Sequence, residues 1–484
     1  MPEFTFLWTD VFVLILVLLL AVYVWHARRS PALRAAWGSV GRTPSAMCAA
    51  IFMVLFLLVG VLDSVHYRPQ LPPLPGQESA APQYSPALRS ALDDLLALTQ
   101  LSQRENTYSA PLALRQFTKE TEIVDGRAVR DFPRLKHAGR HLAHEDDRPA
   151  DIRRRVLAGF AWGGALAFGL GVLLTFAHRL RQPTLAQAWR CWWRRDGTGL
   201  PWRAMWITSA VLAIVLAIVA RLSVDYHVLG TDRTGNDVLW QCIKSIRTAL
   251  VIGTLTTVAM LPPALGFGIA AGYFKGRVDD VIQYLYTTLT SIPGVLLIAA
   301  SVMMMQVYID THPELFTTVA SRADLRLFML CLILGFTGWA GLCRLLRAET
   351  LKLRELEYVQ AARAFGVGHW RIMRRHLLPN VMHIVLITLV LEFSGLVLYE
   401  AVLSYLGIGV DPSMPSFGAM IDAARLEMSR DPMVWWNLFG AFIFLLLIVL
   451  SANIFADAVQ MAFDPRTRRI QPQAASAGAP EAAS

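Results

Sequence analysis

Cysteine is scarce in this chain, and the thiols that do occur are scattered along it. The five cysteines form no C-x-x-C pair; they are Cys48, Cys191, Cys242, Cys331 and Cys343. Three of them lie in or at the edge of apolar stretches. The spacing therefore predicts neither a disulfide framework nor a cysteine metal site.

Nucleotide and zinc motifs are also missing from the sequence. No G-x-x-x-x-G-K-[ST] loop occurs, so we expect no P-loop ATP site on this chain. No H-E-x-x-H occurs either. The pair Gly266-x-Gly268 lies inside an apolar run without the strand of a dinucleotide site, which favours helix packing. A polar stretch with three histidines could hold a metal, but its spacing favours a solvated loop (His137, His141 and His144 with Glu145, Asp146 and Asp147).

Charge is low as well, and apolar residues dominate. Of 484 residues, 55% are hydrophobic and 17% are charged, and the mean hydropathy is +0.44. Soluble domains carry about 25% charged residues, so this balance indicates a polytopic membrane protein. The net charge of +9 is concentrated in short loops beside apolar runs, which is typical of membrane orientation and not of nucleic-acid binding.

About nine apolar segments are long enough to cross roughly 30 Å of hydrocarbon. All should be helices, because an open backbone cannot satisfy its hydrogen bonds in lipid. The first run follows the acidic Glu3 and Asp10, which predicts a retained span and not a signal peptide. The segments are about 8–25, 45–64, 156–177, 204–221, 249–272, 282–306, 327–343, 381–400 and 434–456.

Loop charge predicts the orientation of these spans. The strongly basic segments 27–42, 178–203 and 344–379 alternate correctly with the others if all three are cytoplasmic. The N-terminus is then outside and the C-terminus inside. Arg153–Arg155 stand against this rule at the outer start of a span, but long loops such as 66–152 are largely exempt from it.

Composition divides the chain into five parts. Residues 1–65 hold two spans, 66–152 form an extracytoplasmic loop, 153–203 hold a third span, 204–466 form a transport core and 467–484 a disordered tail. The loop opens with the proline-rich spacer 69–76 and continues with an amphipathic helix over 86–101. It is either a small α-rich domain or a partly ordered excursion.

The polar, basic stretch 353–380 lies between two apolar spans and has helical periodicity. Tyr358, Ala361, Ala362 and Phe365 fall at i, i+3, i+4 and i+7, so they should form one stripe that seats a partner. Gly366 and Gly368 should break this helix. A second helix is expected from Trp370 to Leu377, ending at Pro379.

Two carboxylates lie in the eighth span. Glu392 and Glu400 are eight residues apart, within about 80° on a helical wheel. One interpretation places them on a substrate path. The other places Glu400 at the outer interface and leaves Glu392 paired or protonated. Pro293, like Pro262-Pro263, should kink its span as a gate or as a packing bend, and the bend is favoured.

The stretch 353–380 resembles the cytoplasmic "EAA" loop of bacterial ABC-importer permeases, with Glu357, Ala361, Ala362 and Gly366 at its centre. Other segments resemble the C-type permease subunit of dipeptide, oligopeptide and nickel importers. They are 230-GTDRTGNDVL-239 with 247-RTAL-250, 403-LSYLGIGVDPSMPSFGAMI-421 and 453-NIFADAVQMAFDPR-466. Asn236 and Ser245 depart from the family pattern, which usually has Arg and Gly there.

The resemblance implies an all-α permease core of six spans, the first at 204–221, with the permease region at about 245–465. It also implies a second permease subunit, two cytoplasmic ATP-binding subunits and an extracytoplasmic solute-binding protein. ATP and magnesium would bind those ATPase chains and no cofactor would bind this one, which is then not an enzyme. ATPase coupling is expected from Glu357, Tyr358, Ala361, Ala362, Phe365, Gly366, Arg375 and Pro379, and the outer element from Asp232, Gly235 and Asp237. The competing hypothesis is a stand-alone secondary transporter or channel.

Overall fold

The computed structural model describes most of the chain. The described residues are 3–71, 84–85, 88–124, 127–142, 144–179, 184, 187, 189, 193, 199–315 and 318–463. Most of the proline-rich spacer, the start of the expected helix at 86 and the tail 467–484 lie outside them.

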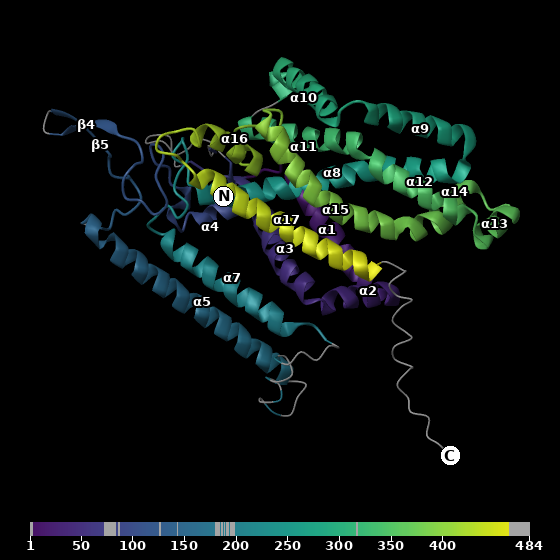
Figure 1. Ribbon diagram of the computed structural model, residues 1–484, viewed down its shortest axis with the longest axis horizontal. Helices are drawn as coiled ribbons and strands as arrows, with labels where there is room; N and C mark the ends of the chain where they lie inside the picture. Colours follow the sequence, from purple (N-terminus) through teal and green to yellow (C-terminus); the bar gives the residue numbers. More distant parts are fainter. Residues whose placement is uncertain are drawn as a thin grey trace, which may run out of the picture.

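The described residues are overwhelmingly helical, as Figure 1 shows. The helices are α1 (Trp8–Arg29), α2 (Pro31–Arg42), α3 (Pro44–Asp63), α4 (Ala91–Leu96), α5 (Arg148–Arg179), α7 (Trp202–Leu222), α8 (Val238–Phe274), α9 (Gly276–Ser291), α10 (Gly294–Thr311), α11 (Val319–Gly338), α12 (Ala340–Arg354), α13 (Glu357–Ala364), α14 (His369–Ile372), α15 (Leu378–Tyr405), α16 (Phe417–Glu427) and α17 (Trp436–Phe463). Nine helical segments of the described chain are long and apolar enough to cross a membrane. The prediction of an all-α polytopic membrane protein is confirmed.

Strands are few and short in the described chain. Strands β1 (Glu3–Phe4), β2 (His66–Arg68) and β3 (Arg89–Ser90) form an antiparallel sheet in that order. Strands β4 (Glu120–Val124) and β5 (Arg127–Asp131) form a hairpin in which Glu120 pairs with Asp131. The sheet ties the N-terminus to the segment that follows α3.

Two predicted spans differ from the structure. Helix α8 begins at Val238 and not near residue 249. Lys244 and Arg247 interrupt its apolar pattern, but the helix continues through them because both are buried with acidic partners. The predicted span 282–306 is two helices, since α9 ends at Ser291 and Pro293 caps α10. By contrast, α8 runs without a break through Pro262 and Pro263.

The helices have two distinct ends (Figure 1). The described residues of 88–147 and 223–237, here called the loop layer, lie at one end, and α13 and α14 lie at the other. The predicted basic loop 27–42 contains α2, which packs against the last turns of α17, away from the loop layer. Two of the three segments that loop charge groups together, 27–42 and 344–379, thus lie away from the loop layer, whereas most of 178–203 lies outside the described residues. Which end faces the cytoplasm stays a prediction.

The loop layer has no separate apolar core. Leu92, Leu96 and Leu101 pack with Leu239 of α8, and Tyr108 packs with Val238 and Trp436 of the spans. Its described part contains one α-helix, α4, of 6 residues. The described part of 66–152 is therefore not α-rich, and the described part of the helix expected over 86–101 is reduced to α4 and one 3-10 turn. The layer is a cap folded onto the spans.

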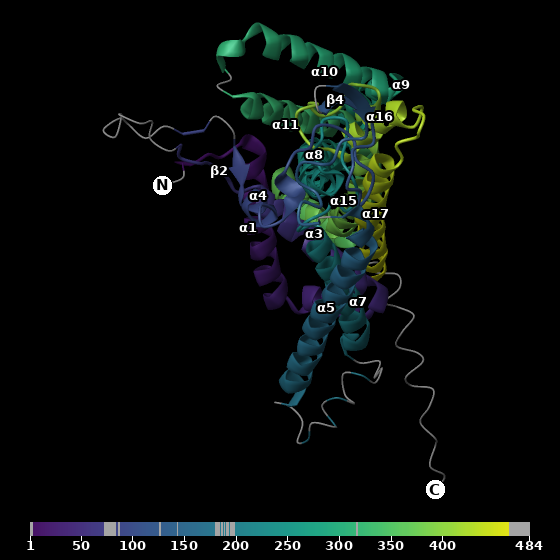
Figure 2. The same ribbon diagram turned by 90° about the vertical axis from the view of Figure 1, so that its left-hand side faces the viewer.

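Helix α3 packs against α8 and α17, whereas α7 packs against α5 and α3. Figures 1 and 2 show α5 and α7 side by side, on the opposite side of the molecule from α9 and α10. Helix α5 approaches α7 closely at Gly163, where a Cβ would lie 2.4 Å from Cα of Ile214. The predicted division at residue 204 therefore does not follow the packing, since α3 contacts the core more extensively than α7 does.

Candidate functional site

The protrusion at the end opposite the loop layer is built around a glycine turn. Helix α13 ends at Ala364, and Gly366 follows with a φ of +74°. The N–H of Gly366 donates to the carbonyl of Arg363, and that of Val367 donates to Ala362, both at 3.1 Å. This pair of bonds is the Schellman arrangement, which requires a left-handed residue that glycine adopts without strain. The predicted break at Gly366 is confirmed.

One face of α13 is exposed, and the other packs against the helix bundle. Val359 is 2% exposed and Ala362 is partly buried in the same apolar cluster. Tyr358, Ala361 and Phe365 are exposed, and Phe365 reaches 87%. The expected stripe is therefore wrong at Ala362, which lies 100° from Ala361 around the helix and faces the bundle. Glu357 and Gly366 are also exposed.

The return segment is continuous with the next span, contrary to the expected stop at Pro379. Helix α14 begins at His369, a π-helical stretch covers Met373–Leu377, and α15 follows at once with Pro379 in its first turn. The wider π turn accommodates the proline, which has no N–H to donate. Arg375, within this turn, is exposed.

Side chains fix the protrusion to its neighbours. Tyr273 at the end of α8 bonds His369 at 2.8 Å between Oη and Nδ1, and Arg354 donates to the Tyr273 carbonyl at 2.7 Å. Asn380 donates to the hydroxyl of Tyr358 at 3.1 Å. The turn is thus attached to α8 and α15, so a force on it would reach both spans.

The two intramembrane carboxylates of α15 have different surroundings. Glu400 is 2% exposed and accepts a hydrogen bond from Ser404 at 2.6 Å, beside Gly418 of α16. Glu392 is exposed. Pro293 lies at the exposed break between α9 and α10. The three residues predicted to line a translocation path therefore differ in exposure. Glu392 and Pro293 are exposed, whereas Glu400 is buried against α16.

The three residues of the outer element lie together at the start of α8. Asp237 caps this helix by accepting from the N–H groups of Leu239 and Trp240, at 2.7 and 3.2 Å. Asp232 accepts from the N–H of Asn236 at 2.9 Å. Gly235 has a φ of +79°, and a Cβ there would meet the carbonyl of Glu105 at 1.9 Å. Within the loop layer, the segment that holds Glu105 thus closes over this turn.

A buried triad joins the outer element to the rest of the loop layer. His227 bonds Asp237 at 2.7 Å and Glu105 at 3.4 Å. Burial alone would lower the pKa of His227, but these two carboxylates outweigh it and raise the pKa to about 9. Burial likewise opposes ionisation of Glu105, but His227 and the N–H groups of Lys136, His137 and Ala138 lower its pKa to about 2. His227 and Glu105 are therefore both charged at neutral pH.

The described residues contain no group of three or more His, Cys, Asp or Glu side chains placed to hold a metal ion. Of the histidines considered above, His141 pairs with Asp151 and Asp225 beside Arg155. This cluster ties the loop layer to the start of α5.

Comparison with known proteins identifies the family. A sequence model of the binding-protein-dependent transport system inner membrane component matches residues 264–469. The dipeptide transport system permease protein of Bacillus subtilis is 30% identical over 244 residues, 50% of this chain and 70% of the relative. The oligopeptide transport system permease protein of Haemophilus influenzae is 30% identical over 243 residues, covering 50% and 71%. The chain belongs to this permease family.

Another relative of the permease is more similar over a smaller share of its own length. The peptidoglycan transport system permease protein of Agrobacterium fabrum is 36% identical over 241 residues, 49% of this chain and 57% of the relative. The resemblance to the C-type permeases of peptide importers is thus confirmed. Together with the nine spans, it makes the permease a multi-pass inner-membrane transporter subunit.

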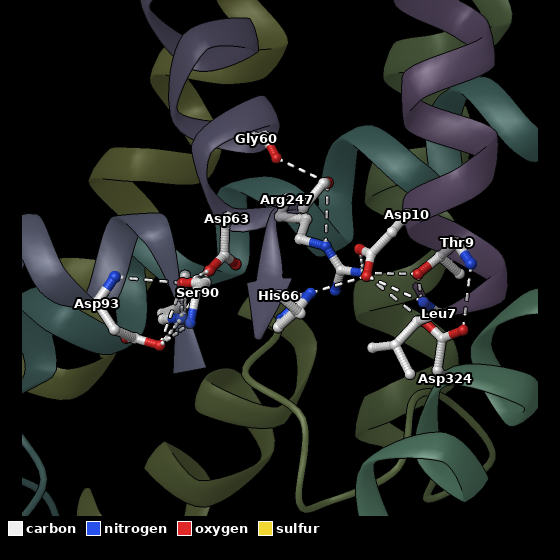
Figure 3. Close-up of polar contacts among 12 residues, drawn as sticks. Leu7, Thr9, Asp10, Gly60, Asp63, His66, Ser90, Asp93, Arg247 and Asp324 are labelled. Carbon is white, nitrogen blue, oxygen red and sulfur yellow. Dashed lines mark hydrogen bonds and ion pairs between the residues drawn. The ribbon is translucent and has the colours of Figure 1, made fainter. Parts of the chain in front are cut away.

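The permease also contains a buried ionic network that the sequence analysis did not identify (Figure 3). Arg247 of α8 donates to Asp10 of α1 at 2.5 Å and to Thr9 at 2.6 Å, with Asp324 of α11 at 3.7 Å. Asp10 also pairs with His66 at 2.8 Å. The sequence did contain a signal for this network, since two cations interrupt one apolar helix and an acidic residue lies at the start of another.

Lys244, one helical turn before Arg247, forms a second centre of the network. It lies 2.6 Å from Asp63 of α3 and 2.8 Å from Asp93 of α4. Ser90 donates to Asp63 at 2.7 Å (Figure 3). Helix α8 of the permease is thereby bound to α1, α3 and the loop layer, all of which precede the region that the family model matches.

Proposed function

We propose that this permease imports peptides or peptide-like solutes and is driven by separate ATPase chains that dock on the α13 turn. In this assembly it works with a second permease subunit, two ATP-binding subunits and an extracytoplasmic solute-binding protein. ATP and magnesium bind the ATPase subunits. Membership of the permease family argues against a stand-alone transporter or channel.

The observation that supports the proposal is the exposed face of α13. Tyr358, Ala361 and Phe365 lie on one side of a short helix that is bonded to α15 through Tyr358 and is followed by α14, which is bonded to α8. An exposed aromatic residue beside small residues, at the tip of a protrusion, is typical of a surface that a partner covers. A partner pressing on this face would move α8 and α15 together, which is a rigid-body switch.

The substrate class rests on the relatives. Their names specify dipeptide, oligopeptide and peptidoglycan transport. These solutes are all peptides or contain peptide chains. The loop layer, at the opposite end from α13, is then the side that receives the solute-binding protein.

The docking proposal is tested by Ala361→Arg. In the reconstituted transporter, we expect peptide import to fall roughly tenfold while ATP hydrolysis continues, because the arginine holds the partner away from the face. Gln360→Arg is the control, since Gln360 is exposed a quarter turn away. Unchanged import by Ala361→Arg would refute docking here. Ala362 is unsuitable for this test because it packs inside the bundle.

The orientation is tested by labelling. A Phe365→Cys variant should react with a membrane-impermeant maleimide in inverted vesicles and not in intact cells, because the proposal puts the α13 turn in the cytoplasm. Labelling in intact cells would reverse the orientation.

A further inference from the structure

Glu392 lies at the middle of α15, on the side that faces away from its neighbours. The next two side chains face the bundle, since Phe393 packs on Gly253 of α8 and Ser394 donates to Asn453 of α17 at 2.6 Å. Glu392 itself is exposed. With α15 running from Leu378 to Tyr405, its carboxylate is about 20 Å along the helix from either end.

This carboxylate has no hydrogen-bond or ion-pair partner among the residues that the structure describes. Glu400 on the same helix is buried and bonded to Ser404. A carboxylate at mid-membrane is costly against lipid, so such residues face a bundle interior or a water-filled cavity. Since the interior of this chain is on the other side of α15, Glu392 points to water or to a second subunit.

The break between α9 and α10 gives a second, independent indication of water on this side of α15, about 10 Å further along the helix. Residues 291–294 are non-helical at their centre and all four are exposed. Tyr399 lies about two turns beyond Glu392 on the same face of α15, and its hydroxyl is 3.8 Å from where a Cβ of Gly294 would be. Non-helical backbone at membrane depth occurs only where protein buries it or a water-filled cavity adjoins it.

The surface between these two features is open. Gly395, one turn after Glu392, is exposed, and a Cβ there would have no atom of the described chain within 4 Å. A carboxylate, a tyrosine ring and a non-helical stretch of backbone therefore lie on one side of α15.

We propose that Glu392 lines the translocation path and attracts the ammonium groups of the solute as it passes. This inference rests on the proposed import of peptides, whose amino termini and lysine side chains carry such groups. A carboxylate in a narrow cavity of low dielectric attracts a cation more strongly than it would in bulk water. Among the described residues no second anion lies beside it, which keeps the contact weak enough for the solute to leave.

The test compares import of three peptides by the reconstituted transporter. They are trialanine and its two variants with a central lysine or a central glutamate. For the unaltered chain we expect the lysine peptide to be imported fastest and the glutamate peptide slowest. Glu392→Gln should reduce the ratio of lysine-peptide to glutamate-peptide import roughly tenfold, the effect of losing one charged contact. Glu392→Lys should invert the order.

Leu398→Gln serves as the control, because Leu398 is exposed on the same helix and the exchange leaves the carboxylate in place. It should keep the ratio of the unaltered chain. A ratio unchanged by both Glu392 variants would overturn the inference. Equal loss of all three peptides would overturn it too, since it would indicate a partner subunit held by Glu392. If the unaltered transporter imports none of the peptides while still hydrolysing ATP, the proposed peptide function fails first, and the inference with it.

Discussion

Arg247 of α8 and Asp10 of α1 form a buried ion pair with a nitrogen–oxygen distance of 2.5 Å, although 237 residues separate them in sequence. Neither side chain is more than 5% exposed. The pair joins the first helix of the chain to the first long helix of the permease region. The N-terminal helices are therefore part of the transporter body and not an appended domain.

Asp10→Ala should destabilise the permease strongly. It removes the nearest carboxylate from the buried Arg247 guanidinium and leaves the more distant Asp63 and Asp324 to balance its charge, and breaking a buried pair costs about 3–5 kcal/mol. We expect a clearly lower unfolding temperature for the purified protein in detergent.

The matched control for Asp10 is Asp422→Asn, which breaks the exposed pair with Arg425 at 3.6 Å. Exposed pairs contribute about 0–1 kcal/mol, so the unfolding temperature should hardly move. Equal shifts in the two variants would mean that the Arg247–Asp10 pair adds no special stability.

Alkaline pH should weaken the attachment of the loop layer through His227. Its pKa is about 9 in the folded chain and about 6.5 when unfolded, so the folded state binds the proton more tightly. This contribution to stability is fully present below about pH 6.5 and is lost as the pH rises through about 9. Glu105 stays ionised throughout, since its pKa is about 2.

The measurement for His227 is the unfolding temperature between pH 6 and pH 10 for the unaltered chain and for His227→Gln. The difference between the two should shrink towards alkaline pH, because the imidazole of His227 is charged only at the lower end. A constant difference would show that the imidazole stabilises by packing alone.

Local pattern predicted the spans and the break at Gly366, because apolar length and glycine are properties of short stretches. It failed where the partner is distant in sequence. Lys244 and Arg247 appeared to end a span, because nothing near them announces Asp63 or Asp10 as counter-ions. Pro379 appeared to stop a helix, because a π turn that accommodates it depends on packing. That α3 contacts α8 more extensively than α7 does is likewise a tertiary property.

Two adjacent glycines of α5 should differ in how well they tolerate a larger side chain. Gly163→Leu would force a Cβ to within 2.4 Å of the α7 backbone at Ile214, whereas Gly164 has nothing within 4 Å. Overpacking of this kind costs about 1–3 kcal/mol, so Gly163→Leu should lower the unfolding temperature and Gly164→Leu should not. Equal tolerance of both changes would contradict the close approach of α5 and α7.

The two glycines of the α13 turn give the last comparison. Gly366 has a φ of +74° and open space around its Cα, so Gly366→Ala adds no clash and acts through the backbone alone, at a cost of about 1 kcal/mol. Gly368 has a φ of −57° and equal space, so alanine fits there. Amide hydrogen exchange at Gly366 and Val367, whose N–H groups close α13, should quicken about fivefold in Gly366→Ala and stay unchanged in Gly368→Ala.

Because these bonds hold the turn that presents Phe365, a faster-opening turn should also transmit force less efficiently. The number of peptides imported per ATP hydrolysed should then fall in the Gly366 variant alone. An equal ratio in both variants would show that the stability of the turn does not affect transport.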